Sequence, residues 1–190
     1  MKKKQNKRIY TPKAFFGFVS DMVDHLGDVR DAHKGDRVSA AFRERLMLAV
    51  TQVNGCRYCS YGHTQFALKA GISQQEIQSL LHGEMGAVPA EETVALVFAQ
   101  HYAESAGQPD AVAYQRLLDT YGLDTSRDIL ALIRTITVGN AYGNSLDAFL
   151  SRLKGKPFSD SRLRQELAIV VGVVFALPAI VVYNWVARLL

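Results

Sequence analysis

Apolar residues recur along most of the chain with the spacing of an α-helix. In the first such segment, residues 12–26, the apolar side holds Phe15, Phe16, Phe18, Val19, Met22 and Val23. Turn and capping signals bound further helical segments at 44–54, 56–70, 73–81, 89–105, 110–121 and from 125 through 138. Residues 28–37 are charged and lack this spacing, which predicts a loop. No segment alternates with period two over a useful length, so the sequence predicts an all-α protein.

The last apolar segment differs from the others because it carries no charge over 21 residues, Leu167 to Ala187. As one helix it would be about 32 Å long, against a bilayer hydrocarbon core of ~30 Å. Tyr183 and Trp185 lie near its end, where interfacial aromatic residues are common. The segment therefore predicts an apolar C-terminal helix that anchors the chain in a membrane. A helix buried in an oligomer interface is the alternative.

Charge is distributed unevenly and divides the chain. Residues 9–151 hold 11 basic and 16 acidic side chains, whereas the two ends together hold 11 basic and 2 acidic ones. A nucleic-acid-binding protein would carry its basic groups on the folded body, so we expect no nucleic-acid partner. Basic residues precede the apolar run at positions 152, 154, 156, 162 and 164, and Arg188 alone follows it. The positive-inside rule then places the folded domain in the cytoplasm, at the cytoplasmic membrane.

These boundaries predict four parts. Residues 1–8 form a basic N-terminal arm, residues 9–153 a helical domain, residues 154–166 a basic linker and residues 167–187 the apolar helix. The arm has no apolar segment long enough behind it to act as a signal peptide. It is either solvated or attracted to an anionic membrane surface.

Both cysteines of the chain lie in one motif, C-x-x-C, formed by Cys56 and Cys59. Asn54-Gly55 predicts a turn, so Cys56 would begin a new helix. On that helix Cys56, Cys59 and His63 stand at positions i, i+3 and i+7, which lie on one face. If the preceding helix packs antiparallel, Glu44 returns to that face. A cysteine at a helix N-terminus favours the thiolate, and an imidazole exchanges protons near neutral pH. This combination predicts thiol redox chemistry.

Three other interpretations fit the same residues. The cysteines could pack as small buried side chains, or form a purely structural disulfide, which is rare in a chain without a secretory signal. Cys56, Cys59, His63 and Glu44 could also complete a tetrahedral zinc site. Structural zinc sites usually draw their ligand pairs from separate loops, whereas three of these four residues lie on one helix. Redox chemistry is therefore the preferred interpretation, with no bound metal or cofactor.

The spacing E-x11-C-x2-C-x3-H, followed by Ala70-Gly71-Ile72-Ser73, resembles the alkylhydroperoxidase D (AhpD) core of the carboxymuconolactone decarboxylase superfamily. The resemblance covers about Phe42 to Gly83 and implies an AhpD-like helical domain. One departure concerns the residues between the cysteines. The best-studied branch is expected to have a histidine there, whereas this chain has Arg57-Tyr58, and a phenol does not shuttle protons at pH 7 as an imidazole does.

The resemblance implies a thiol-dependent peroxidase with peroxiredoxin-type activity. In the implied mechanism the Cys59 thiolate attacks a hydroperoxide, activated by His63 and Glu44, and the sulfenic acid condenses with Cys56. Dipole reasoning alone would make Cys56 the more acidic thiol, so the order stays open. A dithiol reductant, of lipoyl type or a peroxiredoxin partner, and a trimeric or hexameric homo-oligomer are implied as well. The rival functions are a zinc-stabilised, non-catalytic adaptor and a non-redox decarboxylase-like enzyme.

Overall fold

A computed structural model describes residues 7–187 of the chain, without the side chains of residue 181 and residues 183–187. Every regular element in this part is helical: α1 Pro12–Asp24, α2 Leu26–Lys34, α3 Ala40–Asn54, α4 Arg57–Lys69, α5 Gln74–His82, a short 3-10 turn Ala90–Glu92, α6 Thr93–Glu104, α7 Ala111–Leu153, α8 Leu163–Val170 and α9 Gly172–Ala187. The all-α prediction is therefore confirmed. The helix starts follow from local chemistry, because Thr11, Ser39, Ser73 and Asp110 each accept a backbone N–H of the first turn.

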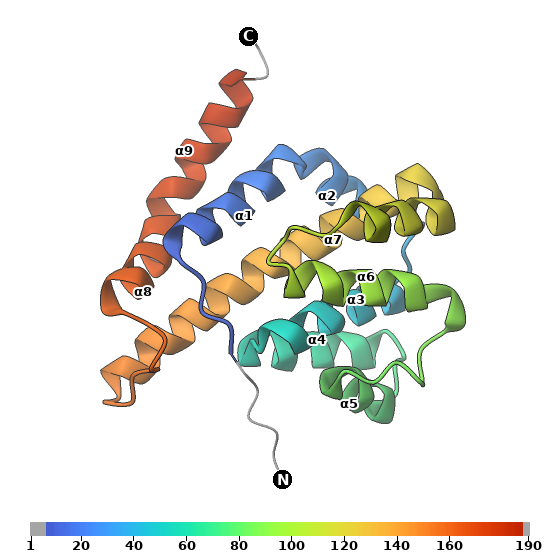
Figure 1. Ribbon diagram of the computed structural model, residues 1–190, viewed down its shortest axis with the longest axis horizontal. Coiled ribbons are helices and arrows are strands. Elements are labelled where there is room, and N and C mark those ends of the chain that lie inside the picture. The colour runs from blue at the N-terminus through green and yellow to red at the C-terminus, as the bar shows by residue number, and fades with distance from the viewer. Residues whose placement is uncertain (1–6, 188–190) are drawn as a thin grey trace.

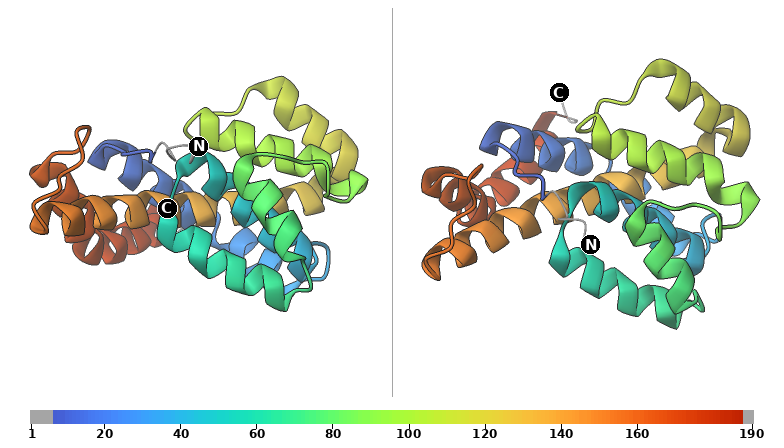
Figure 2. Two further views of the ribbon diagram at one scale, coloured as in Figure 1. Left: turned by 90° about the horizontal axis from the view of Figure 1, so that it is seen from below. Right: turned by 60° about the horizontal axis from the view of Figure 1, so that its bottom comes forward.

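The part of α7 that follows Gly122 crosses the whole molecule, and α7 contacts α1, α2, α3, α4, α6 and α8 (Figure 1). Its first half packs with α2, α3 and α6 around the main core, which includes the fully buried Leu46, Leu48, Leu96, Leu132 and Ile133. Helix α5 lies against α3, on the opposite side of the molecule from α1 (Figures 1 and 2). The two helices that carry Glu44 and the C-x-x-C motif, α3 and α4, both contribute to the main core or pack against it.

A second, smaller core lies at the other end of α7. Tyr10, Phe15, Val19 and Val23 pack there against Ala141 of α7 and Ile169 of α8. The carboxylate of Glu166, itself buried, accepts hydrogen bonds at 2.8 Å from the guanidinium of Arg152. Helix α8 is therefore fixed to the end of α7, and it begins inside the segment that the sequence predicted to be a linker, 154–166.

The apolar C-terminal run is divided between two helices, which corrects the expectation of one continuous helix. Leu167 to Val170 belong to α8, and α9 begins at Gly172 after a break at Val171. Within the described residues no single helix is long and apolar enough to cross a membrane, but Leu163–Val170 and Gly172–Ile180 together pass by length and composition, with a 46° bend. The bend lies close to α1 at Gly172. A Cβ atom at this position would be only 3.2 Å from the ring of Phe16, so the absence of a side chain allows the close approach.

Two other local predictions are resolved by the structure. The prediction of a loop at 28–37 is wrong for most of that segment. Helix α2 extends from Leu26 to Lys34 and buries Ala32 in the main core. The predicted stop at Gly122, between the helices expected at 110–121 and from 125, is confirmed: α7 consists of two helical stretches that meet at Gly122, whose φ of 73° and ψ of 174° are not helical. The predicted arm, residues 1–8, lies mostly outside the described residues, as do Arg188 and the side chains of Tyr183 and Trp185.

Candidate active site

A tight turn joins the two helices that carry the motif. Gly55 ends α3 with φ 69° and ψ 28°, a left-handed conformation that glycine adopts without steric cost. Cys56 follows as the N-cap of α4, and its Sγ accepts the backbone N–H of Cys59 at 3.3 Å. The turn predicted at Asn54-Gly55 is confirmed, and it brings α4 back along α3 in an antiparallel arrangement.

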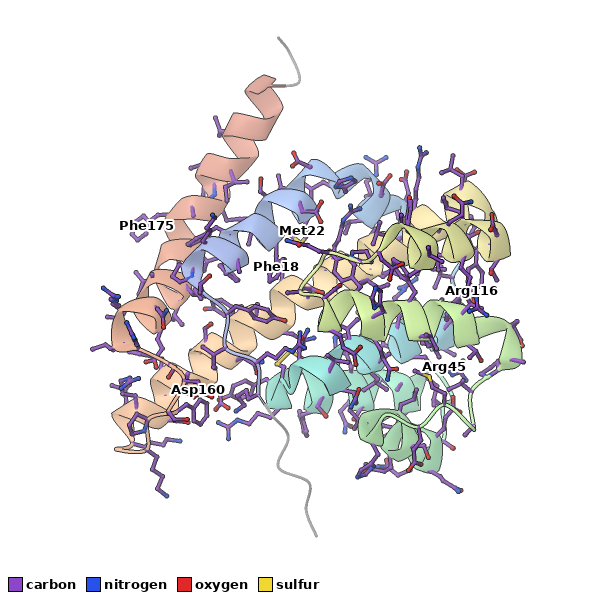
Figure 3. All side chains as sticks on the ribbon, viewed as in Figure 1. Phe18, Met22, Arg45, Arg116, Asp160 and Phe175 are labelled. Carbon is purple, nitrogen blue, oxygen red and sulfur yellow. A yellow bond between two sulfur atoms is a disulfide. The ribbon has the colours of Figure 1, made fainter. Side chains whose placement is uncertain are left out.

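Cys56 and Cys59 are joined by a disulfide, with their Cα atoms 5.4 Å apart (Figure 3). The two sulfur atoms differ in access. Cys56 is 1 % exposed, whereas Cys59, one turn into α4, is partly exposed. A reagent from solvent therefore reaches Cys59 more easily than Cys56.

Glu44 and His63 form the second pair of the motif. Oε2 of Glu44 on α3 lies 2.7 Å from Nδ1 of His63 on α4, and the two side chains are 12 % and 20 % exposed. The ring of His63 also meets Phe66 edge-on, with centroids 6.0 Å apart. The carboxylate holds the imidazole by Nδ1, which leaves Nε2 as the nitrogen available to a reacting group. His63 follows Cys59 by one turn of α4, so the disulfide and the imidazole of the Glu44–His63 pair occupy adjacent turns of that helix.

The disulfide lies against α7 at a glycine. A Cβ atom at Gly143 would be 2.7 Å from Sγ of Cys56 and 3.6 Å from Sγ of Cys59. The close approach to α7 is therefore made at Gly143, where the neighbour is the disulfide. Gly139 is exposed, with no atom within 4 Å of its Cβ position.

Buried polar side chains surround the turn before Cys56. The amide of Asn144 donates to the backbone carbonyls of Asn54, at 2.8 Å, and of Arg8, at 3.0 Å. The hydroxyl of Tyr10 donates to Oδ1 of Asn54 at 2.7 Å, and the N–H of Arg8 donates to the carbonyl of Asn54. The N-terminal segment is thereby attached across the end of α3, close to the redox motif.

Sequence reasoning missed a buried carboxylate beside the motif. Asp147, one turn after Gly143 on α7, is 1 % exposed. It forms ion pairs with the side chains of Lys7 and Arg57, and the hydroxyl of Tyr58 lies 3.4 Å from its Oδ1. Arg57 and Tyr58 are the two residues between the cysteines. The signal in the sequence for this contact was an acidic residue one turn after Gly143, at a buried position of α7.

The geometry does not assemble a metal site. In the part of the chain that the structure describes, no group of three or more His, Cys, Asp or Glu side chains is disposed to hold a metal ion. The four residues of the motif are instead divided into a disulfide and a hydrogen-bonded pair. Such an arrangement is suited to breaking and forming sulfur bonds with a proton acceptor at hand.

Comparisons with known proteins agree with the motif. Residues 20–100 match the model of the carboxymuconolactone decarboxylase family, a stretch that contains all four residues of the motif. The chain is also similar to the Uncharacterized protein YdfG of Bacillus subtilis (strain 168), with 29 % identity over 138 residues, 69 % of this chain and 93 % of that protein. No solved structure matches the chain significantly. Residues 20–100, which carry the disulfide and the Glu44–His63 pair, are thus similar to the carboxymuconolactone decarboxylase family.

Proposed function

We propose that this protein is a thiol-dependent peroxidase that reduces hydroperoxides through a dithiol–disulfide cycle of Cys56 and Cys59. One observation carries the proposal: a carboxylate–imidazole pair lies one helical turn from the more exposed cysteine of a C-x-x-C pair at disulfide distance. Similarity to the carboxymuconolactone decarboxylase family supports an enzyme in general terms, since that family includes both peroxidases and decarboxylases. The cysteine pair favours the redox reaction.

The cycle begins with the reduced dithiol. The Cys59 thiolate attacks one oxygen of the hydroperoxide, the O–O bond breaks, and the departing alkoxide takes a proton from His63. Cys59 is then a sulfenic acid, two electrons more oxidised. The sulfur of Cys56 attacks it, water leaves, and the disulfide forms. An external dithiol returns both cysteines to the thiol state by exchange.

Burial supports this order of attack. Cys59 is the partly exposed cysteine, and it is the one next to His63, whereas Cys56 is almost fully buried beneath α7. A buried resolving cysteine is protected from direct oxidation until the sulfenic acid forms beside it. In this proposal Glu44 holds His63 by Nδ1 and stabilises the imidazolium that forms when the proton is taken up.

The partners follow from the same proposal. The substrate is a hydroperoxide, and the reductant is a small dithiol of lipoyl type or a peroxiredoxin partner. A homo-oligomer, trimeric or hexameric, is consistent with the exposed aromatic residues of α4, Tyr61 at 73 % and Phe66 at 53 %. Aromatic side chains are enriched in subunit interfaces.

We also propose that the C-terminal helix attaches the protein to the cytoplasmic membrane. Val173 and Ile180 of α9 pack against the second core, whereas Val174, Phe175 and Val182 are exposed by 59 % or more. Figure 3 shows Phe175 projecting away from the rest of the molecule. An apolar surface of this kind on an otherwise folded chain favours insertion into lipid or an apolar partner.

The direct test measures hydroperoxide consumption by the purified protein, offered several dithiols. We expect turnover in the intact protein and none in Cys59→Ser, while Cys56→Ser should react once and stop at a sulfenic acid that dimedone traps. Metal analysis of the same sample distinguishes the peroxidase from the zinc-stabilised adaptor. Stoichiometric zinc bound to free thiols would overturn the proposal. Activity on a small lactone that survives in the double Cys→Ser variant would establish the non-redox alternative.

A further inference from the structure

We infer that Asp147 is a positioning residue for the cysteine pair: it fixes Arg57, so that a guanidinium is held at the first turn of α4, between the two cysteines in sequence, and its charge stabilises the thiolate. The inference rests on the thiol chemistry proposed above and adds to it a group that lies outside the motif. Arg57 occupies one of the two positions between the cysteines, and Asp147 comes from a helix 90 residues further along the chain.

Asp147 is almost completely withdrawn from water, which requires that its charge be compensated. Its side chain is 2 % exposed and has three polar neighbours, the ammonium of Lys7, the guanidinium of Arg57 and the phenol of Tyr58. Two of the three belong to the first turn of α4. The carboxylate therefore connects α7 to the turn that carries both cysteines.

The contacts of Tyr58 connect the guanidinium to the side of α7 on which the disulfide lies. A Cβ atom at Gly143 would lie 2.7 Å from Sγ of Cys56 and 4.0 Å from Cδ2 of Tyr58, so the ring and the disulfide share one face of α7. The guanidinium of Arg57 lies over that ring, 4.8 Å from its centroid, and donates to its hydroxyl at 2.9 Å. Arg57 is held from two sides, by the ring and by Asp147.

The charges of this cluster do not cancel. Lys7 and Arg57 contribute two positive charges and Asp147 one negative charge, which leaves one positive charge in this cluster at the first turn of α4. A fixed cation near a thiol lowers the free energy of the thiolate, and the N-terminus of α4 acts in the same direction. Without Asp147, the Arg57 side chain would sample many positions at the surface. Water would then screen its effect on the sulfur atoms.

The experiment compares Asp147→Asn, Arg57→Gln and the double variant. Absorbance at 240 nm of the reduced protein across pH measures thiolate formation, and the reaction with hydrogen peroxide measures nucleophilic rate. Each single variant should raise the thiol pKa and slow the reaction at neutral pH about tenfold, the usual effect of a neighbouring charge. The double variant should match the single ones, because Asp147 acts through Arg57. Asp147→Glu should restore part of the effect.

The same helix offers a matched control. Asp128 has a 3 % exposed side chain paired with the half-exposed Arg37, as Asp147 is paired with Arg57, but it lies far along α7 from the cysteines. Asp128→Asn should lower the unfolding midpoint and leave thiolate formation unchanged. Arg57→Gln, at a 55 % exposed side chain, covers the case in which Asp147→Asn does not fold.

Two results would overturn the inference. Additive effects of the two substitutions would mean that Asp147 and Arg57 act separately. A lower thiol pKa in Asp147→Asn would mean that the carboxylate of Asp147 destabilises the thiolate directly. Neither measurement requires turnover with a reductant. If the protein consumed no hydroperoxide catalytically, the proposed function would fail while the coupling between Asp147 and the thiols could still be read from the titration.

Discussion

Gly143 of α7 faces Cys56 so closely that a methyl group at Gly143 would lie 2.7 Å from the sulfur atom. Carbon and sulfur that are not bonded do not approach to this distance, so one of the two would have to move. Cys56 is held by the turn at Gly55, and Gly143 is in the middle of a long helix packed on both cores. The absence of a side chain at Gly143 therefore creates the space that the disulfide occupies.

Gly143→Ala should destabilise the oxidised protein by about 1 to 3 kcal/mol, the usual cost of inserting a methyl group into a packed site. Denaturant unfolding of the oxidised and reduced forms measures the effect. Gly139→Ala is the matched control: it lies one turn earlier with nothing within 4 Å, and alanine there should be neutral or stabilising by up to about 1 kcal/mol. Equal effects of the two substitutions would contradict the packing argument.

Glu44→Gln should reduce the rate of thiol oxidation at neutral pH by about 10² to 10⁴, the range for loss of general acid–base assistance. Glutamine keeps an oxygen that can accept from Nδ1 of His63 but removes the charge that stabilises the imidazolium. His63→Ala should be at least as damaging, because Cys59 loses its nearest base. Stopped-flow kinetics as a function of pH gives the measurement.

A control for this series is Glu76→Gln. It removes the charge of a carboxylate on α5 that pairs with Arg45, and it should leave the pH–rate profile unchanged. A Glu44→Gln variant with the profile of the unmodified protein would remove Glu44 from the mechanism. The hydrogen bond at 2.7 Å between Glu44 and His63 would then have only a structural role.

The motif could be read from the sequence because its contacts are local. A turn at Gly55 and the helical period are enough to place Cys56, Cys59 and His63 on one face and to return Glu44 to it. Asp147 and Lys7 are different, since Asp147 contacts Tyr58 across 89 residues of sequence and Lys7 contacts Asp147 across 140. No period or spacing encodes such a contact; it depends on how α7 packs against α4 and on where the N-terminal segment crosses.

The errors in the helix prediction have a physical cause as well. Helix α2 is short and mostly charged, with Ala32 as its one fully buried residue, so its apolar spacing is too weak to detect. The break at Val171 is equally invisible, because the residues on both sides are apolar. It arises from packing, since α8 is tied to α7 by Glu166 while Gly172 passes close to Phe16 of α1.

The attachment of α8 should make stability depend on acidity. The hydrogen bond from Arg152, with a further one from Ser161, holds the pKa of Glu166 below the ordinary glutamate value of 4.5. Because the folded-state pKa is the lower one, this contribution to stability is present above the ordinary value and is lost as pH falls through the folded-state value. Thermal unfolding between pH 7 and pH 3 should show this loss, and Glu166→Gln should be less stable at pH 7 but show a smaller decline. Parallel declines in the two proteins would contradict the assignment.

Truncation separates the two parts of the apolar C-terminal run. Deletion after Lys156 removes Glu166 and Ile169, which are buried against α7, so it should uncover the second core and cause aggregation. Deletion after Val171 removes only α9, whose outer side is exposed, and it should leave a folded protein that keeps its thiol chemistry.

The protein truncated after Val171 should no longer float with vesicles containing anionic lipid, whereas the full chain should. Recovery of the full chain in the soluble fraction without detergent would defeat the membrane proposal. In that case, a change of oligomeric state on removing α9 would indicate that α9 packs between subunits instead.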